Sequence, residues 1–172
     1  MTPAEQFAHE GVALVADAIP AALAAAVRAR LAYQRFALLD RGSYEVAERV
    51  VESELFAMLA AIASQATEHA LAVTEARVLR LRAGDYVLAH HDRIYGDRPI
   101  EAVVDLSPAE VPRAELHYRR RGQVFFRVPS APHSLAIVDR TPVITCNHVY
   151  VSRSVPTADV IRLVATLRAT TS

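Results

Sequence analysis

Several features that are common in other proteins are absent from this sequence. The single cysteine, Cys146, excludes an internal disulfide and is compatible with a reducing compartment. The chain has no tryptophan, and its 19 basic residues balance its 19 acidic residues. Neither base stacking nor net positive charge therefore favours a nucleic acid as the partner.

Long apolar runs are also missing. A helix that spans a bilayer needs about 20 apolar residues, and runs such as 21–27 are far shorter. The start, Met1 to Phe7, lacks a basic segment that leads into an apolar stretch, so we expect no signal peptide. These absences predict a soluble, cytoplasmic protein with no membrane partner.

The length of the chain predicts one domain. A chain of 172 residues is long enough for a single sizeable core and too short for two ordinary domains, and it contains no repeat, low-complexity tract or linker. We expect residues 1–75 to form a support of helices and a strand, 76–153 a β core, and 154–172 a C-terminal helix. The residues carry no signal for an oligomeric state.

The pattern of apolar residues predicts helices first and strands later. Residues 11–16 favour a strand, Pro20 opens an alanine-rich helix that reaches about Ala32, and helical spacing continues over 53–69. A last helix is expected over 158–167. Beyond residue 76, short apolar runs recur between Gly and Pro, which is typical of a closed or double-sheet β structure. These runs are 102–106, 124–128, 135–138 and 143–145.

The triplet His90-His91-Asp92 is the strongest candidate for chemistry. In an extended strand the side chains at positions i and i+2 point to the same face, so His90 and Asp92 can bind one metal ion while His91 points away. Two imidazoles and one carboxylate form the facial triad of non-heme Fe(II) oxygenases, which leaves positions open for co-substrates. A His-x-Asp triplet also arises by chance, so its flanking residues matter.

Those flanking residues resemble the Fe(II)/2-oxoglutarate-dependent dioxygenases, in particular small prolyl-hydroxylase-like members. The resemblance covers the second half of the chain, in segments 79–92, 98–106, 114–118 and 122–129. It implies a mostly β protein with flanking helices, built on a double-stranded β-helix, the jelly-roll core also seen in cupins. It also implies Fe(II) bound by His90, Asp92 and His133, with 2-oxoglutarate and O2 as co-substrates.

The resemblance further implies a basic residue that binds the distal carboxylate of 2-oxoglutarate. Arg140 is the candidate, because a guanidinium group matches a carboxylate with two parallel hydrogen bonds, and Thr141 can add a hydroxyl. Arg140 follows His133 more closely than the family pattern has it. The alternative is an exposed arginine paired with Asp139.

Other residues compete for roles in this site. Several family members carry a tyrosine three positions before the glycine that corresponds to Gly84, where this chain has Leu81. Arg80, Arg82 or Tyr86 are candidates to replace its contact with the keto acid. His148 is an alternative distal ligand, but we prefer His133 because the run 122–129 leads into it.

The predicted function follows from the resemblance. We expect an oxidoreductase, a hydroxylase that acts on an unactivated C–H bond of a small molecule such as an amino acid or a biosynthetic intermediate. The carboxylate of Asp92 favours hydroxylation over halogenation, because family halogenases have a small residue there. Hydroxylation of a peptidyl residue is one alternative. A cupin-like metalloenzyme that uses no keto acid and a non-catalytic binding module are the others.

Overall fold

The computed structural model describes residues 1–90 and 99–170, and Asp92 lies outside them. Three helices precede most of the strands: α1 (Pro3–Glu10), α2 (Ala21–Arg30) and α3 (Ser53–Thr67). The strands are β1 (Val12–Val15), β2 (Gln34–Leu38), β3 (Gly42–Ala47), β4 (Leu71–Arg82), β5 (Tyr86–His90), β6 (Ile100–Asp105), β7 (Leu116–Arg120), β8 (Gln123–Val128), β9 (Leu135–Asp139), β10 (Ile144–His148) and β11 (Asp159–Ala169).

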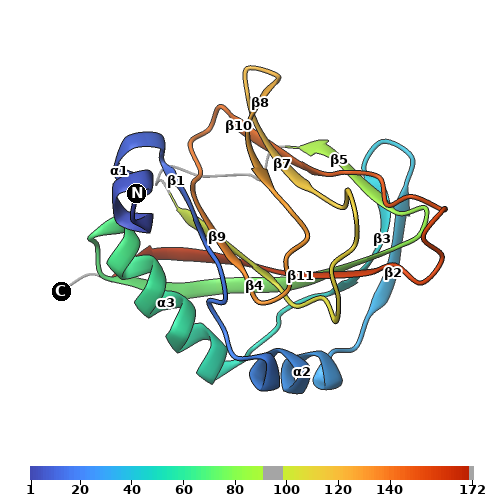
Figure 1. The fold of residues 1–172 in the computed structure, drawn as a ribbon, viewed down its shortest axis with the longest axis horizontal. Helices are drawn as coiled ribbons and strands as arrows, with labels where there is room; N and C mark the ends of the chain where they lie inside the picture. Colours follow the sequence, from blue (N-terminus) through green and yellow to red (C-terminus); the bar gives the residue numbers. More distant parts are fainter. Residues whose placement is uncertain (91–98, 171–172) are drawn as a thin grey trace.

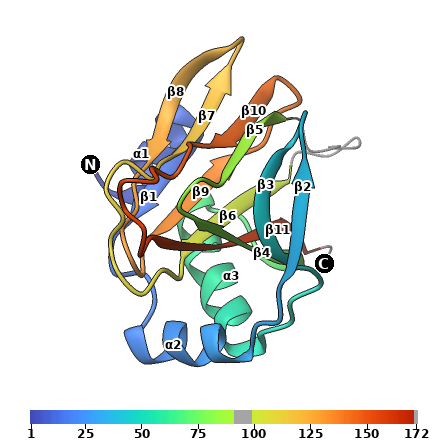
Figure 2. The same cartoon turned by 90° about the vertical axis from the view of Figure 1, so that its right-hand side faces the viewer.

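The strands form a jelly roll. Eight of them make two facing groups of four, in the orders β4-β11-β6-β9 and β5-β10-β7-β8, and every neighbouring pair is antiparallel. β1 extends the first group beside β9, and β3 pairs with both β4 and β5, so it joins the groups. Figure 2 shows the two groups facing each other. The predicted mostly β fold with a jelly-roll core is confirmed.

The first group of strands has helices on its outer face and an apolar interior on its inner face. α2 and α3 lie below β4 and β11 in Figure 1. Alternate residues of β11, namely Ile161, Leu163 and Ala165, belong to the apolar cluster that includes α3 residues such as Leu59. Between the two groups a second cluster includes Val103, from β6. This alternation follows from the two-residue period of a strand.

Several predicted elements are confirmed near the N-terminus. β1, α2 and α3 lie within the predicted ranges. The turn at Gly84 and Asp85 also forms: Gly84 has a φ of 93°, which favours glycine, and the N–H of Asp85 donates to the carbonyl of Arg82 at 2.9 Å.

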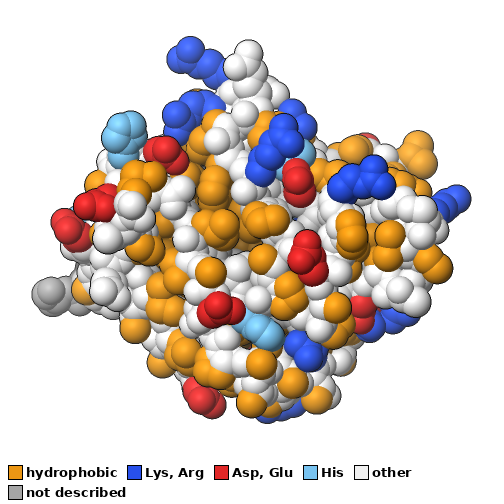
Figure 3. All heavy atoms as spheres, in the orientation of Figure 1, with side chains coloured by type: hydrophobic (Ala, Val, Ile, Leu, Met, Phe, Trp, Pro, Cys, Tyr) orange, Lys and Arg blue, Asp and Glu red, His pale blue; other side chains and the backbone are white. Residues whose placement is uncertain are grey.

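No helix in the described ranges is long and apolar enough to span a bilayer. In Figure 3, acidic and basic side chains are interspersed on the visible face.

The predicted C-terminal helix is wrong. Residues 159–169 form β11, which pairs with β4 on one side and β6 on the other. A strand buried on both faces reads as a nearly continuous apolar run, and periodicity alone cannot distinguish it from a buried helix. The predicted boundary at residue 76 also differs from the structure, because β2 and β3 join the sheet and β4 begins at Leu71.

Candidate active site

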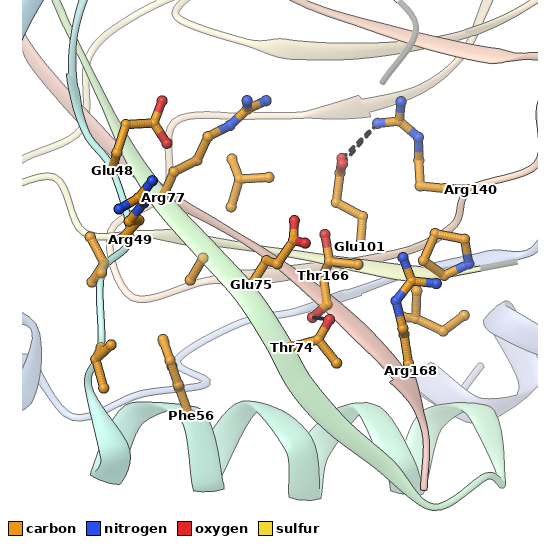
Figure 4. A pocket seen from close by; sticks show the side chains of 16 residues that line it. Glu48, Arg49, Phe56, Thr74, Glu75, Arg77, Glu101, Arg140, Thr166 and Arg168 are labelled. Atoms are coloured by element: carbon orange, nitrogen blue, oxygen red, sulfur yellow. Dashed lines mark hydrogen bonds and ion pairs between the residues drawn. The ribbon is translucent and has the colours of Figure 1, made fainter. Parts of the chain in front are cut away.

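A cavity of about 800 Å³ opens beside the inner face of β4, β6 and β11. Its wall combines apolar groups with both signs of charge, as Figure 4 shows. Its apolar lining includes Val164, on the inner face of β11, and Phe56 of α3, on the helix side of the sheet. The charged residues are Glu48, Arg49, Glu75, Arg77, Glu101, Arg140 and Arg168. A cavity with an apolar body and a few converging polar groups is typical of a small-molecule site.

The end of β5 lies next to this cavity. His90 is the last residue of β5, and its backbone pairs with that of Cys146 in β10. The Nη1 atom of Arg140, which lines the cavity, donates to Sγ of Cys146 at 3.4 Å. Pro99, where the described chain resumes, also lines the cavity. The backbone on both sides of residues 91–98 is therefore at the cavity, although the position of Asp92 itself is outside the described residues.

A buried polar cluster forms one wall of the cavity. Nη1 of Arg140 donates to both carboxylate oxygens of Glu101 at 2.9 Å, and the hydroxyl of Tyr118 donates to Oε1 of Glu101 at 2.6 Å. The three side chains are buried, with Arg140 only 1% exposed. Burial and the adjacent Glu101 carboxylate raise the pKa of Tyr118 well above its usual value, so the phenol stays protonated. The pairing satisfies charges that would otherwise be costly to bury.

A second buried arginine lies deeper between the sheets. Arg162 of β11 is 1% exposed, and its Nη2 donates to the carbonyl of Ala114 at 2.6 Å. Its Nη1 lies 3.2 Å from Nδ1 of His148, while its enclosed Nε has no hydrogen-bond partner among the residues that the structure describes. Burial lowers the pKa of Arg162. Because a guanidinium group can only donate, Nδ1 of His148 accepts, and the neutral ring then carries its proton on Nε2.

The structure does not bring His133 to the end of β5. The N–H of His133 donates to the carbonyl of Asp105 at 2.8 Å, and its own carbonyl accepts from Ala18 at 2.9 Å. Asp105 ends β6, whereas Glu101, in the cavity wall, stands near the start of that strand. Four residues of a strand span about 13 Å, far more than the roughly 2 Å of a metal–ligand bond. The geometry thus argues against His133 as the distal ligand.

The remaining predicted residues lie in different places. Arg140 is buried against Glu101, so the alternative of an exposed arginine is wrong. Thr141 lies in the turn after β9, and its enclosed hydroxyl has no hydrogen-bond partner within residues 1–90 and 99–170. Arg80 forms a two-point ion pair with Asp159, at 2.6 and 2.9 Å, and is not part of the cavity wall.

Tyr86 begins β5, at the end of the strand opposite His90. It lines a separate shallow depression, together with Leu88 and Tyr150. The side chain of Tyr86 therefore gives the cavity no contact.

Sequence reasoning missed three polar residues of the interior: Glu101, Tyr118 and Arg162. Glu101 and Tyr118 lie in segments 98–106 and 114–118, to which the sequence assigned no site residue. Arg162 lies in the segment predicted as a C-terminal helix, where a strand's alternation was not considered. Once β11 is a strand, Arg162, Val164 and Thr166 share one face by simple alternation, and that face is the inner one. Assigning residues 159–169 to a strand would therefore have placed Arg162 in the interior.

Comparison with protein-family models gives no match, and neither does comparison with the curated proteins. Solved structures do match. An oxidoreductase of the 2OG-Fe(II) oxygenase family from Burkholderia pseudomallei has a TM-score of 0.73 at 16% identity, covering 96% of this chain and 88% of that one. A prolyl hydroxylase from Trichoplax adhaerens, in complex with a hypoxia inducible factor peptide, has a TM-score of 0.73 at 10% identity and covers 96% and 87%.

A third similar structure is HygX from Streptomyces hygroscopicus, with nickel, 2-oxoglutarate and hygromycin B bound. Its TM-score is 0.69 at 12% identity, and the match covers 96% of this chain and 86% of that one. The chain thus has the fold of the 2-oxoglutarate–Fe(II) oxygenases over nearly its whole length. The family resemblance predicted from the sequence is confirmed at the level of the fold.

Proposed function

We propose that this chain is an Fe(II)- and 2-oxoglutarate-dependent oxygenase that hydroxylates a C–H bond of a small polar molecule. The observation that carries the proposal is the position of β5: the strand that holds His90 ends beside the cavity of a jelly roll with this family's fold. The bound iron and keto acid would supply the activation of dioxygen. The residues of this chain would hold both groups, orient the substrate and exclude water.

The iron would be held by His90 and Asp92, with a third donor from β10. Cys146 is the register partner of His90 in the neighbouring strand. A thiolate is an accepted ligand for iron. His148 lies two residues further along β10, and its Nδ1 contacts Arg162. We favour Cys146 over both His133 and His148 as the third donor because it is the register partner of His90.

The keto acid would be anchored by Arg162. The guanidinium of Arg140 is already bound by the carboxylate of Glu101, so a second carboxylate there would have to displace it. Among the described residues, the enclosed Nε of Arg162 has no hydrogen-bond partner, and Arg162 lies two positions before Val164, a cavity residue, on the same face of β11. A buried arginine with an unused donor fits the distal carboxylate of 2-oxoglutarate. Arg140 then stabilises the cavity wall.

Hydroxylation of a peptidyl residue is the second candidate. It is favoured by the fold shared with the Trichoplax adhaerens enzyme, which was solved with a peptide fragment. The fold shared with HygX, solved with hygromycin B, supports a small molecule instead. Since the cavity wall contains seven charged residues, Glu48, Arg49, Glu75, Arg77, Glu101, Arg140 and Arg168, we favour a small polar substrate.

An anaerobic titration tests the proposal. The protein is loaded with Fe(II) and then with 2-oxoglutarate, and the visible absorption spectrum is recorded. We expect a metal-to-ligand charge-transfer band that saturates with the keto acid. Iron binding without this band would indicate a metalloenzyme that uses no keto acid. If the protein did not bind iron, a binding module would be the better description.

Three variants test the choice of the third donor. Cys146→Ala should weaken iron binding by at least about tenfold, because a ligand is lost. His133→Ala should leave iron binding unchanged, since that residue lies at the far end of the barrel. His148→Ala should keep iron and raise the 2-oxoglutarate concentration at half saturation, because Arg162 loses a contact. Loss of iron in His133→Ala alone would refute the assignment.

A further inference from the structure

The outer face of the β5-β10-β7-β8 group contains the shallow depression that Tyr86 lines. Its volume is about 620 Å³. His117 and Arg119 alternate with buried residues along β7, and Asn147 does so along β10, so these side chains of the lining project away from the barrel interior. The depression is therefore separate from the cavity beside β4 and β11, and the proposed oxygenase chemistry does not use it.

The side of the depression nearest β5 is apolar. It is formed by Tyr86 and Leu88 of β5 and by Tyr150, which follows β10. Leu88 is 44% exposed and Tyr150 is 49% exposed, which is unusual for large apolar side chains in this fold. Among the described residues, no charged side chain lines this side. Exposed apolar groups that gather in a depression are typical of protein–protein contact sites.

The side toward β7 and β8 is basic. Nε of Arg119 donates to Oδ1 of Asn147 at 2.9 Å, and its Nη1 donates to the carbonyl of Gly122 at 3.1 Å. Both acceptors are neutral, so these bonds hold the guanidinium at the edge of the depression without cancelling its charge. Arg121 lies in the two-residue turn between β7 and β8, is exposed, and makes no hydrogen bond or ion pair within the described residues.

The carboxylate of Glu115 lies on the same face but is already engaged. Its Oε2 is 2.5 Å from Nε2 of His117 and 3.7 Å from Nη1 of Arg127, which is opposite His117 in β8. Neither Arg119 nor Arg121 has a carboxylate partner in the part of the chain that the structure describes. This side of the depression thus keeps a positive charge, although the formal charge of the whole chain is zero.

We propose that this outer face binds an acidic peptide segment of a partner protein. One large apolar side chain of the segment would enter the depression beside β5, and its acidic side chains would pair with Arg119 and Arg121. A second copy of this chain, bound through the same face, would bring like charges together. A nucleic acid strand would bring phosphates to the β5 side, which has no cation in its lining. The inference goes beyond the proposed function and does not depend on it.

The strand spacing sets the separation between the apolar and acidic groups of such a segment. Only β10 lies between β5 and β7, and neighbouring strands are about 4.8 Å apart, so the two sides of the depression are about 10 Å apart. An extended peptide covers this distance in about three residues. The peptide Phe-Gly-Gly-Glu-Asp, acetylated and amidated at its ends, has this spacing.

Three matched peptides test the proposal on the full chain: Phe-Gly-Gly-Glu-Asp, the uncharged Phe-Gly-Gly-Gln-Asn, and Ala-Gly-Gly-Glu-Asp, which lacks the large apolar side chain. Changes in amide chemical shifts give an apparent Kd for each peptide. We expect the first to bind at least about threefold more tightly than either of the others, with shifts at the amides of β5, β7 and β10. Equal affinities, or shifts confined to β4 and β11, would overturn the proposal.

Substitutions then assign the two sides. Arg121→Gln removes no contact within the described protein, and both it and Arg119→Gln should reduce the preference for the charged peptide over Phe-Gly-Gly-Gln-Asn. Tyr150→Ala should reduce the preference for Phe over Ala. The control is Arg30→Gln, an exposed arginine of α2, which Figure 2 shows at the opposite end of the molecule from β7 and β8. If both Arg119→Gln and Arg121→Gln kept the full preference while folded, the assignment would be wrong.

A short oligothymidylate separates a peptide partner from a nucleic acid. If it bound more tightly than Phe-Gly-Gly-Glu-Asp and lost affinity in Arg119→Gln, the face would be a nucleic-acid site and the proposal would be overturned. The outcome is also separable from that of the oxygenase proposal. Selective peptide binding should be the same with and without Fe(II) and 2-oxoglutarate, whether or not the charge-transfer band forms. A band together with equal binding of the three peptides would retain the oxygenase and reject the docking face.

Discussion

At the scale of single residues, the structure contains two buried arginines in the interior, Arg140 and Arg162, whereas the sequence pointed to one. Arg140 was predicted to anchor a carboxylate, and it does bind one, but that carboxylate is Glu101 of its own chain. Arg162 is equally buried and is held by a backbone carbonyl and an imidazole. The sequence shows that an arginine is present, but whether another group has already neutralised it depends on the strand beside it.

Arg162→Lys tests which of the two binds the keto acid. Lysine keeps the charge but lacks the planar fork that matches a carboxylate, so we expect the 2-oxoglutarate concentration at half saturation to rise by about tenfold or more. Arg140→Lys should change it less, and Arg127→Lys, an exposed control, should not change it. The measurement is the charge-transfer band against keto acid concentration. If Arg140→Lys raised the 2-oxoglutarate concentration at half saturation more than Arg162→Lys did, Arg140 would be the residue that binds the keto acid.

At the scale of elements, the sequence predicts a segment well when one of its faces contacts solvent. The amphipathic pattern of α3 and the short β1 were found in this way. β11 was read as a helix because its residues pack against helices on one face and against the barrel interior on the other. Only its pairing with β4 and β6 decides its conformation, and that pairing is not encoded within the segment.

Truncating a buried side chain of β11 should show the importance of this strand. Leu163 is completely buried among residues from the helices and from β6. We expect Leu163→Ala to lower the free energy of unfolding by about 2 to 5 kcal/mol, through lost burial and a residual cavity. Urea denaturation gives the value, with exposed Thr170→Ala as a control that stays within about 0.5 kcal/mol. A cost near that of the control would contradict the central position of β11.

At the scale of the whole molecule, the topology decides which residues can share a site. The sequence located the His90 strand and the fold, because the local pattern of this region is specific. The sequence could not show that β10 is the strand beside the His90 strand, because β9 and β10 follow each other closely along the chain but belong to different groups. His133 precedes the strand of one group and Cys146 lies in the other. Choosing between them requires the strand order.

The stability of the whole fold should depend on pH through Asp85. Burial alone would raise the pKa of this carboxyl, but hydrogen bonds from Arg35 and from the backbone N–H of Arg82 outweigh burial and hold the pKa below its usual value. The ionised form therefore stabilises the folded state above the unfolded pKa of about 3.9, and this contribution is lost as the pH falls through the lower, folded pKa.

Unfolding midpoints measured between about pH 2 and pH 6 would reveal this contribution. We expect the stability of the unmodified chain to fall as the solution is acidified through this range, and that of Asp85→Asn to fall less. Glu110→Gln, which replaces an exposed carboxylate, should follow the unmodified chain. Parallel curves for Asp85→Asn and the unmodified chain would show that Asp85 contributes nothing to acid sensitivity.

The position of β11 also has a consequence for how the chain reaches its folded state. β11 comes after every other strand in the described sequence, yet it separates β4 from β6. Until it pairs, those two strands present unsatisfied backbone edges, and closing the gap between them joins segments about 80 residues apart on the β4 side. Such late, long-range pairing slows folding and leaves a window for aggregation. During synthesis, the sheet that supports the cavity would remain incomplete until β11 has left the ribosome.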